Sequence, residues 1–484
     1  MQLPLASLKK RKILKIILNL ANHKHITVYL VGGCIRDWLL KREEILDFDF
    51  AVNSHSLKFA KELSKKLKAP FVLLDEPHGC ARIVVKNNSE TINLDFSDFR
   101  ASTIEEDLRK RDFSINALAL KLDDIFLSNK KISDSLLDPY NGKSDLKKRR
   151  VCFLDYNTFS NDPLRMLRAF SISARLNFKI DKKTIVKIKK ESGKIRNVSR
   201  ERVREEFFKL FSIVRSYPYF SLLEKSSLLE KIIPEIKLMY RLKQGAYHHL
   251  DVWRHTLETL RQLEMIIISL RSKKLTAYLN EEVSGNHKRF ALLKFSAILH
   301  DIAKPATFSR VGRKIHFYGH ERLGAKMAET IAERLRFSTK EKKALKNIIY
   351  WHLRPGHMAD LESLSERALF RYFRDCQEEA VSVALLSLAD QRATRGKLQD
   401  DSQRKRHEKL IRFLIIEYFR RNEEHRELPL INGNVVMKSL HLEPGPMVGK
   451  ILNELKEAQA EGAIRTKMQA IAWAKRFYKQ LSKA

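Results

Sequence analysis

The hydrophobic pattern of this chain changes near residue 150, and that change constrains the fold more than any other feature. Between about 26 and 120, short β-branched runs alternate apolar and polar residues, which is typical of strands, and helical stretches separate them. After about 150, long segments rich in Lys and Glu repeat their apolar residues with a 3.6-residue period. The pattern predicts an α+β fold, in which an α/β head with a mixed sheet precedes an all-α body. The expected strands are 26–31, 46–52, 81–85, 91–96 and 116–120.

The charge of the chain points to a polyanionic partner. Its 484 residues include 93 Lys and Arg against 58 Asp and Glu, which gives a formal net charge of +35. Such an excess is typical of proteins that bind nucleic acid through phosphates. Solvated Lys-rich helix faces would give the same number, so charge alone does not name a function. The length predicts about three domains.

Membrane and disulfide classes are excluded by composition. No apolar run approaches the roughly 18–20 residues of a membrane span, so we expect no membrane contact. The most lipophilic early stretch, 13–20, is broken by Lys15 and lacks a cleavage site, which predicts a basic amphipathic helix over 1–25 rather than a signal peptide. The four cysteines show no CxxC spacing, which excludes a disulfide scaffold or zinc finger and predicts a cytoplasmic protein.

Two short motifs near the start carry chemistry. Gly32 and Gly33 end an expected strand, with Arg36 following in the first turn of a helix, where a phosphate is favoured. A Gly-Gly pair by itself is more often just a turn. Asp47 and Asp49 alternate with phenylalanines, so both carboxylates lie on one face of a strand. They repel each other unless a cation lies between them, and Mg²⁺ binds carboxylate and phosphate oxygens together. The pair predicts a two-metal site for attack of a hydroxyl on a phosphoryl group.

These motifs resemble the head of the class II tRNA nucleotidyltransferases and bacterial poly(A) polymerases. The resemblance implies that Asp47 and Asp49 are catalytic and hold Mg²⁺, that Gly33 and Arg36 contact the nucleotide triphosphate, and that Arg111 contacts the incoming nucleotide. Matching segments follow the family's order over about residues 26–215. They are LVGGCIRDWLL (30–40), LDFDFAV (46–52), EDLRKRDFSINA (106–117), NDPLRMLR (161–168) and VSRERV (198–203).

A third acidic residue often assists such sites. Asp95 and Asp98 are the candidates, and we expect each of them to be structural.

An acidic residue and an arginine offer a way to choose a base without a template. Asp162 before Pro163 is a standard helix start, with Asp as the N-cap, and Arg165 and Arg168 follow at three-residue steps. A carboxylate only accepts hydrogen bonds and a guanidinium only donates them, so the pair complements cytosine and adenine and mismatches guanine and uracil. The resemblance assigns base reading to Asp162 and Arg165, with Arg168 nearby.

Two positions depart from the family. Asn161 stands where the family commonly has an acidic residue, and Ser171 where it often has an arginine. These departures leave open which nucleotides are added and how many.

A second group of residues lies in the helical region. A single His or a His-Asp doublet is unremarkable, but imidazole and carboxylate together suit Mn, Ni, Fe, Co or Mg²⁺ centres. The region resembles an HD metal-dependent phosphohydrolase domain, which implies four core ligands and two additional ones. The core ligands would be His255, His300, Asp301 and Asp390, and the additional ones His320 and His352. A degenerate HD fold that only supports RNA is the alternative.

The predicted organisation has five parts. After the HD domain the chain is basic and helical, and Trp473, Phe477 and Tyr478 either stack on bases or, more often in such helices, anchor their helix. The parts are a basic N-terminal helix (1–25), a nucleotidyltransferase head (26–145), a helical neck and RNA-binding body (146–240), an all-α HD domain (241–395) and a basic helical tail (396–484).

The expected function is template-independent addition of CMP and AMP, from CTP and ATP, to the 3′ end of tRNA. The 3′-hydroxyl attacks the α-phosphate, and pyrophosphate leaves. Four alternatives stay open: addition of the terminal A only, addition of CC only, poly(A) polymerase, and an HD phosphohydrolase whose head merely binds RNA. No long arginine-rich insert follows the aspartates, which disfavours poly(A) polymerase. No specificity for DNA is expected.

Overall fold

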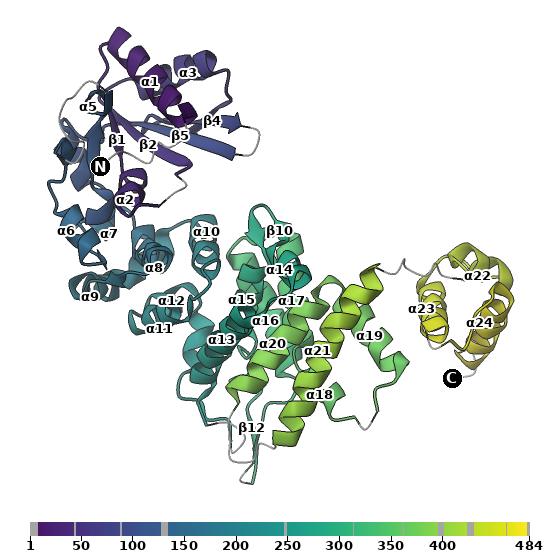
Figure 1. The fold of residues 1–484 in the computed structure, drawn as a ribbon. Helices are drawn as coiled ribbons and strands as arrows, with labels where there is room; N and C mark the ends of the chain where they lie inside the picture. The colour runs from purple at the N-terminus through teal and green to yellow at the C-terminus, as the bar shows by residue number, and fades with distance from the viewer. Residues whose placement is uncertain are drawn as a thin grey trace. The chain divides into compact units, whose positions relative to one another are not determined.

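The computed structural model describes residues 8–42, 45–87, 90–126, 134–245, 249–312, 314–361, 363–394, 401–423, 430–460 and 462–481. The chain forms two compact units (Figure 1). Unit 1 comprises Met1–Leu210 and Leu222–Ile232, and unit 2 comprises Phe211–Ser221 and Ile233–Ala484. The predicted boundary between HD domain and tail, at 395–396, lies outside the described residues.

Unit 1 contains a seven-stranded sheet in the order β3-β4-β5-β2-β1-β6-β7. β2 and β5 run parallel and the other neighbouring pairs are antiparallel, so the predicted mixed sheet is confirmed. The strands are β1 (Val28–Val31), β2 (Asp47–Val52), β3 (Phe71–Asp75), β4 (Cys80–Asn87), β5 (Glu90–Asp98), β6 (Ala119–Lys121) and β7 (Leu136–Leu137).

The period-2 pattern gives the sheet an apolar face and a polar one. On the apolar face the rings of Phe50 and Phe96 stack with centroids 4.7 Å apart, and Phe59 of α3 (Ser56–Leu67) packs on Phe96 at 5.6 Å. The alternate residues of β2, including Asp49, lie on the opposite face. The aromatic core packs on one side of the sheet. The other side carries the acidic residues next to a smaller buried cluster, in which Val31 and Ala51 pack with Leu108 of the helix 104–109.

Two strands of the seven-stranded sheet, β3 and β7, were not predicted, and β6 begins later than expected. β3 is an edge strand in which Val72, Leu73 and Leu74 are 42–50% exposed, so it shows no alternation of buried residues. β6 starts only at Ala119, because Asn116 ends a 3₁₀ turn and its side chain binds Arg36 and Asp112.

Helices make up most of the remainder of unit 1, and a short parallel pair, β8 (Arg150–Val151) and β9 (Lys179–Ile180), joins them. α1 packs against α3 and α5. The helices are α1 (Leu8–His23), α2 (Gly33–Leu39), α4 (Ile104–Arg109), α5 (Leu122–Phe126), α6 (Gly142–Lys147), α7 (Thr158–Asn161), α8 (Leu164–Leu176), α9 (Lys182–Glu191), α10 (Arg200–Phe211) and α12 (Leu228–Ile232), with 3₁₀ segments Ser114–Asn116 and Ser192–Asn197. Helix α11 (Tyr217–Lys225) is divided between the units, because residues up to Ser221 belong to unit 2.

Unit 2 is helical, as predicted, apart from two small hairpins. Its centre is α13 (Val252–Ser269), which packs against α15 (Arg289–Leu299) and α20 (Ala380–Ala393). Gly285, with a φ of +53°, lies in the turn between β10 (Glu282–Ser284) and β11 (His287–Lys288). The other elements are α14 (Lys273–Asn280), β12 (Ser309–Val311), β13 (Lys314–His316), α16 (His320–Arg334), α17 (Thr339–Trp351), α18 (Arg354–Ala359), α19 (Glu366–Cys376), α21 (Asp401–Glu423), α22 (Gly433–Leu440), α23 (Pro446–Ala460) and α24 (Lys467–Leu481), with 3₁₀ segments Pro234–Met239 and Gln377–Glu379.

The helices α22, α23 and α24 share a small hydrophobic core of their own, in which Val436 and Ile451 are fully buried. Trp473, Phe477 and Tyr478 are partly buried against this core. Their contacts are those of anchoring residues. Among the described residues, no helix is both long and apolar enough to cross a membrane.

Candidate functional site

The acidic face of the sheet is built by the register of β2 and β5. Asp47 lies opposite Asn93 and Asp49 opposite Asp95, so all four side chains emerge on one face. The Asn93 amide donates to Asp47 Oδ1 at 2.8 Å. Arg82 of β4 donates to both oxygens of Asp95 at 2.7 Å. The third carboxylate beside the Asp47–Asp49 pair is therefore Asp95.

Asp98, the other candidate, has a structural contact instead. Its carboxylate accepts the backbone N–H of Ser56 at 2.9 Å and so fixes the start of α3.

Asp49 is the electrostatically strained member of the pair. Burial raises the pKa of Asp49, the guanidinium of Arg111 lowers it, and the carboxylates of Asp95 and Asp47 raise it further. A divalent cation on this face would relieve that repulsion. The carboxylate oxygens that are present fit a hard cation such as Mg²⁺.

Gly32 lets the backbone after β1 approach both the guanidinium of Arg111 and the carboxylate of Asp49. Its φ is +77°, and a Cβ at this position would lie 3.1 Å from Arg111 Nη1 and 3.2 Å from Asp49 Oδ2. A side chain here would enter the site itself. The family resemblance implies a nucleotide contact at Gly33, whose added Cβ would instead meet the guanidinium of Arg36 at 3.3 Å.

Arg36 and Arg111 are both held by carboxylates of the head. Arg36 is 2% exposed and donates to Asp37 at 2.9 and 2.8 Å and to Asn116 Oδ1 at 2.6 Å. Arg111 donates to Asp107 at 3.3 and 3.2 Å. These contacts orient the two guanidinium groups, and their roles toward a triphosphate stay predictions.

Asp162 and Arg165 stand at the start of α8. Asp162 Oδ1 accepts the N–H of Leu164 at 3.2 Å, which is the expected capping contact, and Oδ2 accepts from Arg202 at 2.9 Å. Arg165 donates to the carbonyls of Arg111 at 3.1 Å and Lys110 at 2.8 Å. The predicted base-reading helix is thus tied by hydrogen bonds to the Arg111 motif.

Arg168 forms an ion pair with the buried Asp112 that was not predicted. It donates to Asp112 Oδ2 at 3.1 and 2.8 Å and lies 3.7 Å from Glu206. Burial raises the pKa of Asp112, but the charge of Arg168 and a hydrogen bond from Asn116 outweigh it and lower the pKa to about 2. The only sequence signal for Asp112 was its place beside Arg111 in the matching motif.

A cavity of about 360 Å³ opens beside Arg165. The residues that line it come from the turn before β4, the end of β5, the segment after α4 and the end of α7. They are Pro77, His78, Asp98, Phe99, Arg100, Lys110, Asn161 and Arg165.

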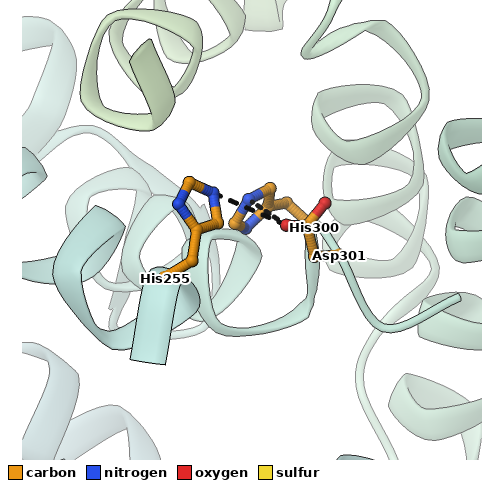
Figure 2. Close-up of side chains that lie close together, drawn as sticks. All are labelled: His255, His300 and Asp301. Carbon is orange, nitrogen blue, oxygen red and sulfur yellow. Dashed lines mark ion pairs between the residues drawn. The ribbon is translucent and has the colours of Figure 1, made fainter. Parts of the chain in front are cut away.

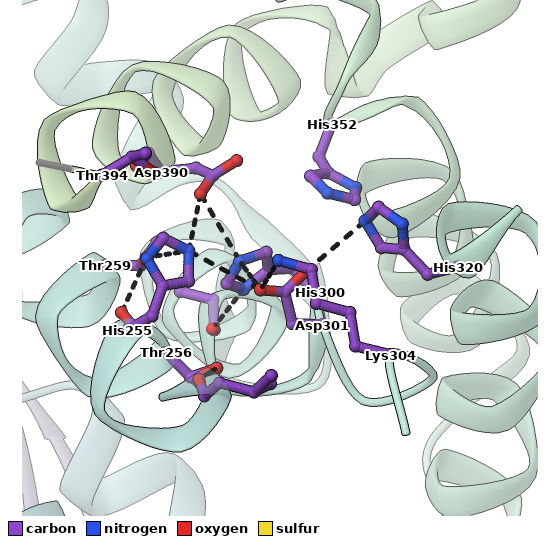
Figure 3. A network of polar contacts seen from close by, with 12 residues as sticks. His255, Thr256, Thr259, His300, Asp301, Lys304, His320, His352, Asp390 and Thr394 are labelled. Atoms are coloured by element: carbon purple, nitrogen blue, oxygen red, sulfur yellow. Dashed lines mark hydrogen bonds and ion pairs between the residues drawn. The ribbon is translucent and has the colours of Figure 1, made fainter. Parts of the chain in front are cut away.

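All six predicted HD residues converge in unit 2 (Figure 3). His255 comes from α13, His300 and Asp301 follow α15, and Figure 2 shows these three side chains pointing toward one another. His255 Nε2 lies 2.8 Å from Asp390 Oδ1 and 3.6 Å from Asp301 Oδ2, and His300 Nε2 lies 3.2 Å from the same Asp301 oxygen. The other Asp301 oxygen lies 3.5 Å from His320 Nε2.

Three of the histidines are oriented as metal ligands usually are. The Nδ1–H groups of His300, His320 and His352 donate to carbonyls three residues earlier, at 2.9, 2.7 and 2.6 Å. Their Nε2 atoms are buried and make no hydrogen bond among the described residues. Ligating histidines typically bind a backbone carbonyl through the other ring nitrogen in this way. These free nitrogens, with the carboxylates, fit a divalent metal ion.

Asp301 joins two groups of candidate ligands. One is His255, His300 and Asp301, and the other is Asp301, His320 and His352. Burial raises the pKa of Asp301, but His300 and Lys304 outweigh it and leave it well below its usual value. Burial and the neighbouring imidazoles lower the pKa of His352 to about 3, so its ring is neutral, as a ligand must be.

Lys304 also lies in this cluster, and the sequence analysis did not single it out. Its Nζ is 2.7 Å from Asp301 Oδ2 and donates to Gln244 Oε1 at 2.6 Å. The contact of Gln244 with Lys304 could not be predicted from the sequence, because only the folded chain brings these two residues together.

Three stretches of the chain match known families. Residues 28–152 match the Poly A polymerase head domain, 177–239 the Probable RNA and SrmB- binding site of polymerase A, and 252–395 the HD domain. An A-adding tRNA nucleotidyltransferase of Deinococcus radiodurans is 30% identical over 456 residues, which are 93% of this chain and 95% of the relative. The chain belongs to the tRNA nucleotidyltransferase family.

This nucleotidyltransferase is similar to further relatives. A CC-adding tRNA nucleotidyltransferase of Thermus thermophilus is 30% identical and covers 92% of each chain. A Multifunctional CCA protein of Actinobacillus pleuropneumoniae is 30% identical over 69% of this chain and 77% of the relative. The solved structure of the Thermotoga maritima CCA-adding enzyme complexed with tRNA has the same fold, with a TM-score of 0.62, 19% identity and coverage of 98% of this chain and 96% of that one. Nucleotidyltransferases of the family normally use a divalent metal ion.

Proposed function

We propose that this protein adds CMP, AMP or both to the 3′ end of tRNA without a nucleic-acid template. The observation that carries the proposal is the acidic face, on which Asp47, Asp49 and Asp95 lie beside Gly32 and Arg111. The tRNA 3′-hydroxyl attacks the α-phosphate of CTP or ATP, and pyrophosphate leaves. Asp47 and Asp49 would hold Mg²⁺, which supplies charge neutralisation of the triphosphate.

Base choice is assigned to Asp162 and Arg165. The carboxylate accepts from the exocyclic amino group of cytosine or adenine, and the guanidinium donates to the adjacent ring nitrogen. The hydrogen bonds from Arg165 to the Arg111 and Lys110 carbonyls support a fixed geometry for this pair.

The relatives favour addition of part of the CCA end. The A-adding and CC-adding enzymes are matched over more than nine-tenths of both chains, whereas the Multifunctional CCA protein is matched over 69% of this one. The test uses three tRNA transcripts, ending before CCA, after C and after CC, each with labelled CTP, ATP or both. Partial addition is supported by either of two results. An A-adding enzyme extends only the CC-ended transcript, by one A, and a CC-adding enzyme extends the shorter transcripts and stops at CC. Complete CCA on all three contradicts it, and long A ladders identify a poly(A) polymerase.

A second activity is favoured by the HD cluster. We propose that His255, His300, Asp301, His320, His352 and Asp390 hold divalent metal ions for hydrolysis of terminal or 2′,3′-cyclic phosphates, which block extension of damaged tRNA. The observation that supports it is the three buried Nε2 atoms, which make no hydrogen bond within the described part of the chain.

Two sets of substitutions separate the proposed activities. Asp47→Ala with Asp49→Ala abolishes incorporation and spares phosphate release, and His300→Ala with Asp301→Ala does the reverse. The assays are gel-resolved incorporation and release of phosphate from end-modified tRNA after addition of Mn²⁺, Ni²⁺ or Mg²⁺. Wild-type protein that releases no phosphate with any of these ions would leave the HD domain as a structural body.

A further inference from the structure

The β12–β13 hairpin is built into one wall of the HD cluster. Phe317, directly after β13, accepts the Nδ1–H of His320 at its carbonyl, at 2.7 Å, and its ring lies 5.5 Å from Lys304 Nζ. On the same side of the hairpin, Ile315 lies against Gly245, where an added Cβ would be 3.7 Å from Ile315 Cβ. One side of the hairpin therefore faces the candidate ligands.

The small exposure that the cluster keeps lies at Asp390 and, to a lesser extent, at this wall. The side chains of His255, His300 and His352 are fully buried, and Asp301 is 1% exposed. Exposure remains at Asp390, His320 and Lys304, at 20, 9 and 8%. Two of these three side chains contact Phe317. A substrate that reaches the cluster along this edge passes the end of the hairpin.

The other side of the hairpin presents aromatic rings. His316 pairs with Ser309, so its side chain points away from Ile315 and Phe317. The rings of His316 and Tyr318 stack in parallel, with centroids 5.0 Å apart and planes at 11°. Tyr318 is 78% exposed, so its ring is open to a further flat partner.

The hairpin is also basic. Residues 305–320 contain no Asp or Glu. Lys314 pairs with Val311 and lies on the same side as His316, whereas Arg310 pairs with Ile315 on the opposite side. Stacked aromatic rings beside basic side chains are typical of surfaces that bind single-stranded nucleic acid. A small phosphoester would need neither feature, because it contacts only the ligand cluster.

We propose that the aromatic side of this hairpin, formed by His316 and Tyr318, binds a base of the RNA strand whose 3′-terminal phosphoester enters the HD cluster. The inference rests on the proposed phosphohydrolase function and names its substrate class. That class is RNA 3′ ends, as opposed to free nucleotides or small phosphate esters.

Binding is tested on the full chain with a tRNA acceptor minihelix that has 2-aminopurine as its last base and a 3′-phosphate. Stacking on Tyr318 quenches the fluorescence of this base. Tyr318→Ala should remove the quenching and weaken this mode of binding about tenfold, and Tyr318→Phe should keep both. Leu361→Ala, 53% exposed and outside the hairpin, is the control and should behave as wild type. Unchanged quenching in Tyr318→Ala overturns the proposal.

Hydrolysis supplies the second measurement. With a minihelix that ends in a 2′,3′-cyclic phosphate, Tyr318→Ala should raise KM about tenfold, while hydrolysis of bis(p-nitrophenyl) phosphate stays within about twofold of wild type. An equal loss on both substrates means that Tyr318 only supports the fold of the site and overturns the proposal. If wild-type protein hydrolyses neither substrate, the phosphohydrolase function fails, and the quenching experiment still decides whether the hairpin binds RNA.

Discussion

At the scale of single residues, the nucleotide site depends on a position that has no side chain. Gly32→Ala would place a methyl group between Arg111 and Asp49 at a backbone angle that favours glycine. We expect kcat/KM for CTP or ATP to fall about 100-fold, since small displacements of reacting groups have effects of that size. Gly193→Ala is the control, because an added Cβ there would meet nothing within 4 Å. Near-normal activity of Gly32→Ala would contradict the close approach.

The Asp112–Arg168 pair predicts a pH-dependent stability. Because the pKa of Asp112 is lowered to about 2 in the folded state, its stabilising contribution is fully present above its unfolded pKa of about 3.9 and is lost as the pH falls toward 2. Asp112→Asn should lower the free energy of unfolding by about 2 kcal/mol at pH 7, and the difference should shrink below pH 4. Urea unfolding at pH 7, 5 and 3.5 measures it. A difference that does not change with pH would assign the loss to packing.

At the scale of elements, the sequence was most informative where burial repeats along an element. β2 was predicted because its phenylalanines and aspartates alternate between a buried and an exposed face. The β12–β13 hairpin was missed inside a region predicted to be helical, since strands of three residues are too short to show a period. The HD residues were found because they follow a family pattern. The contacts of Arg168 with Asp112 and of Lys304 with Gln244 join residues 56 and 60 positions apart, and no local pattern encodes such pairs.

Helix α15 carries a buried charge that gives a second pH prediction. Lys294 is fully buried and lies 2.6 Å from Glu264 of α13. Burial lowers the pKa of Lys294 to about 8, so the folded state binds fewer protons than the unfolded state between about pH 8 and 10.4. This group therefore makes the free energy of unfolding rise with pH across that window. In Lys294→Met, the free energy of unfolding should lack the rise with pH that this group gives the wild-type protein. Chemical denaturation of both proteins at pH 7.5, 8.5 and 9.5 measures it. Parallel profiles of the two proteins would contradict the shifted pKa.

At the scale of the whole molecule, the net charge of +35 predicts that tRNA binding is led by phosphate contacts. Each released counterion contributes to the salt dependence, so raising monovalent salt from about 50 to 200 mM should weaken tRNA binding about 1,000-fold. Filter binding or anisotropy at constant Mg²⁺ measures this. A change of less than about fivefold would show that the positive charge serves another purpose.

The division into units has a consequence for how such a chain can be cut or acquired. The backbone passes between the units after Leu210, after Ser221 and after Ile232, so neither unit is one continuous stretch of sequence. Within unit 2, Glu264 accepts the N–H of Ser216 at 2.7 Å, which ties the early segment to a helix encoded much later. A gene fragment that stops near residue 240 would therefore produce the segment 211–221 of unit 2 without Glu264, which accepts its hydrogen bond. The HD-containing unit could not have been joined to, or lost from, the nucleotidyltransferase unit by a single break in the gene without dividing one of the two units.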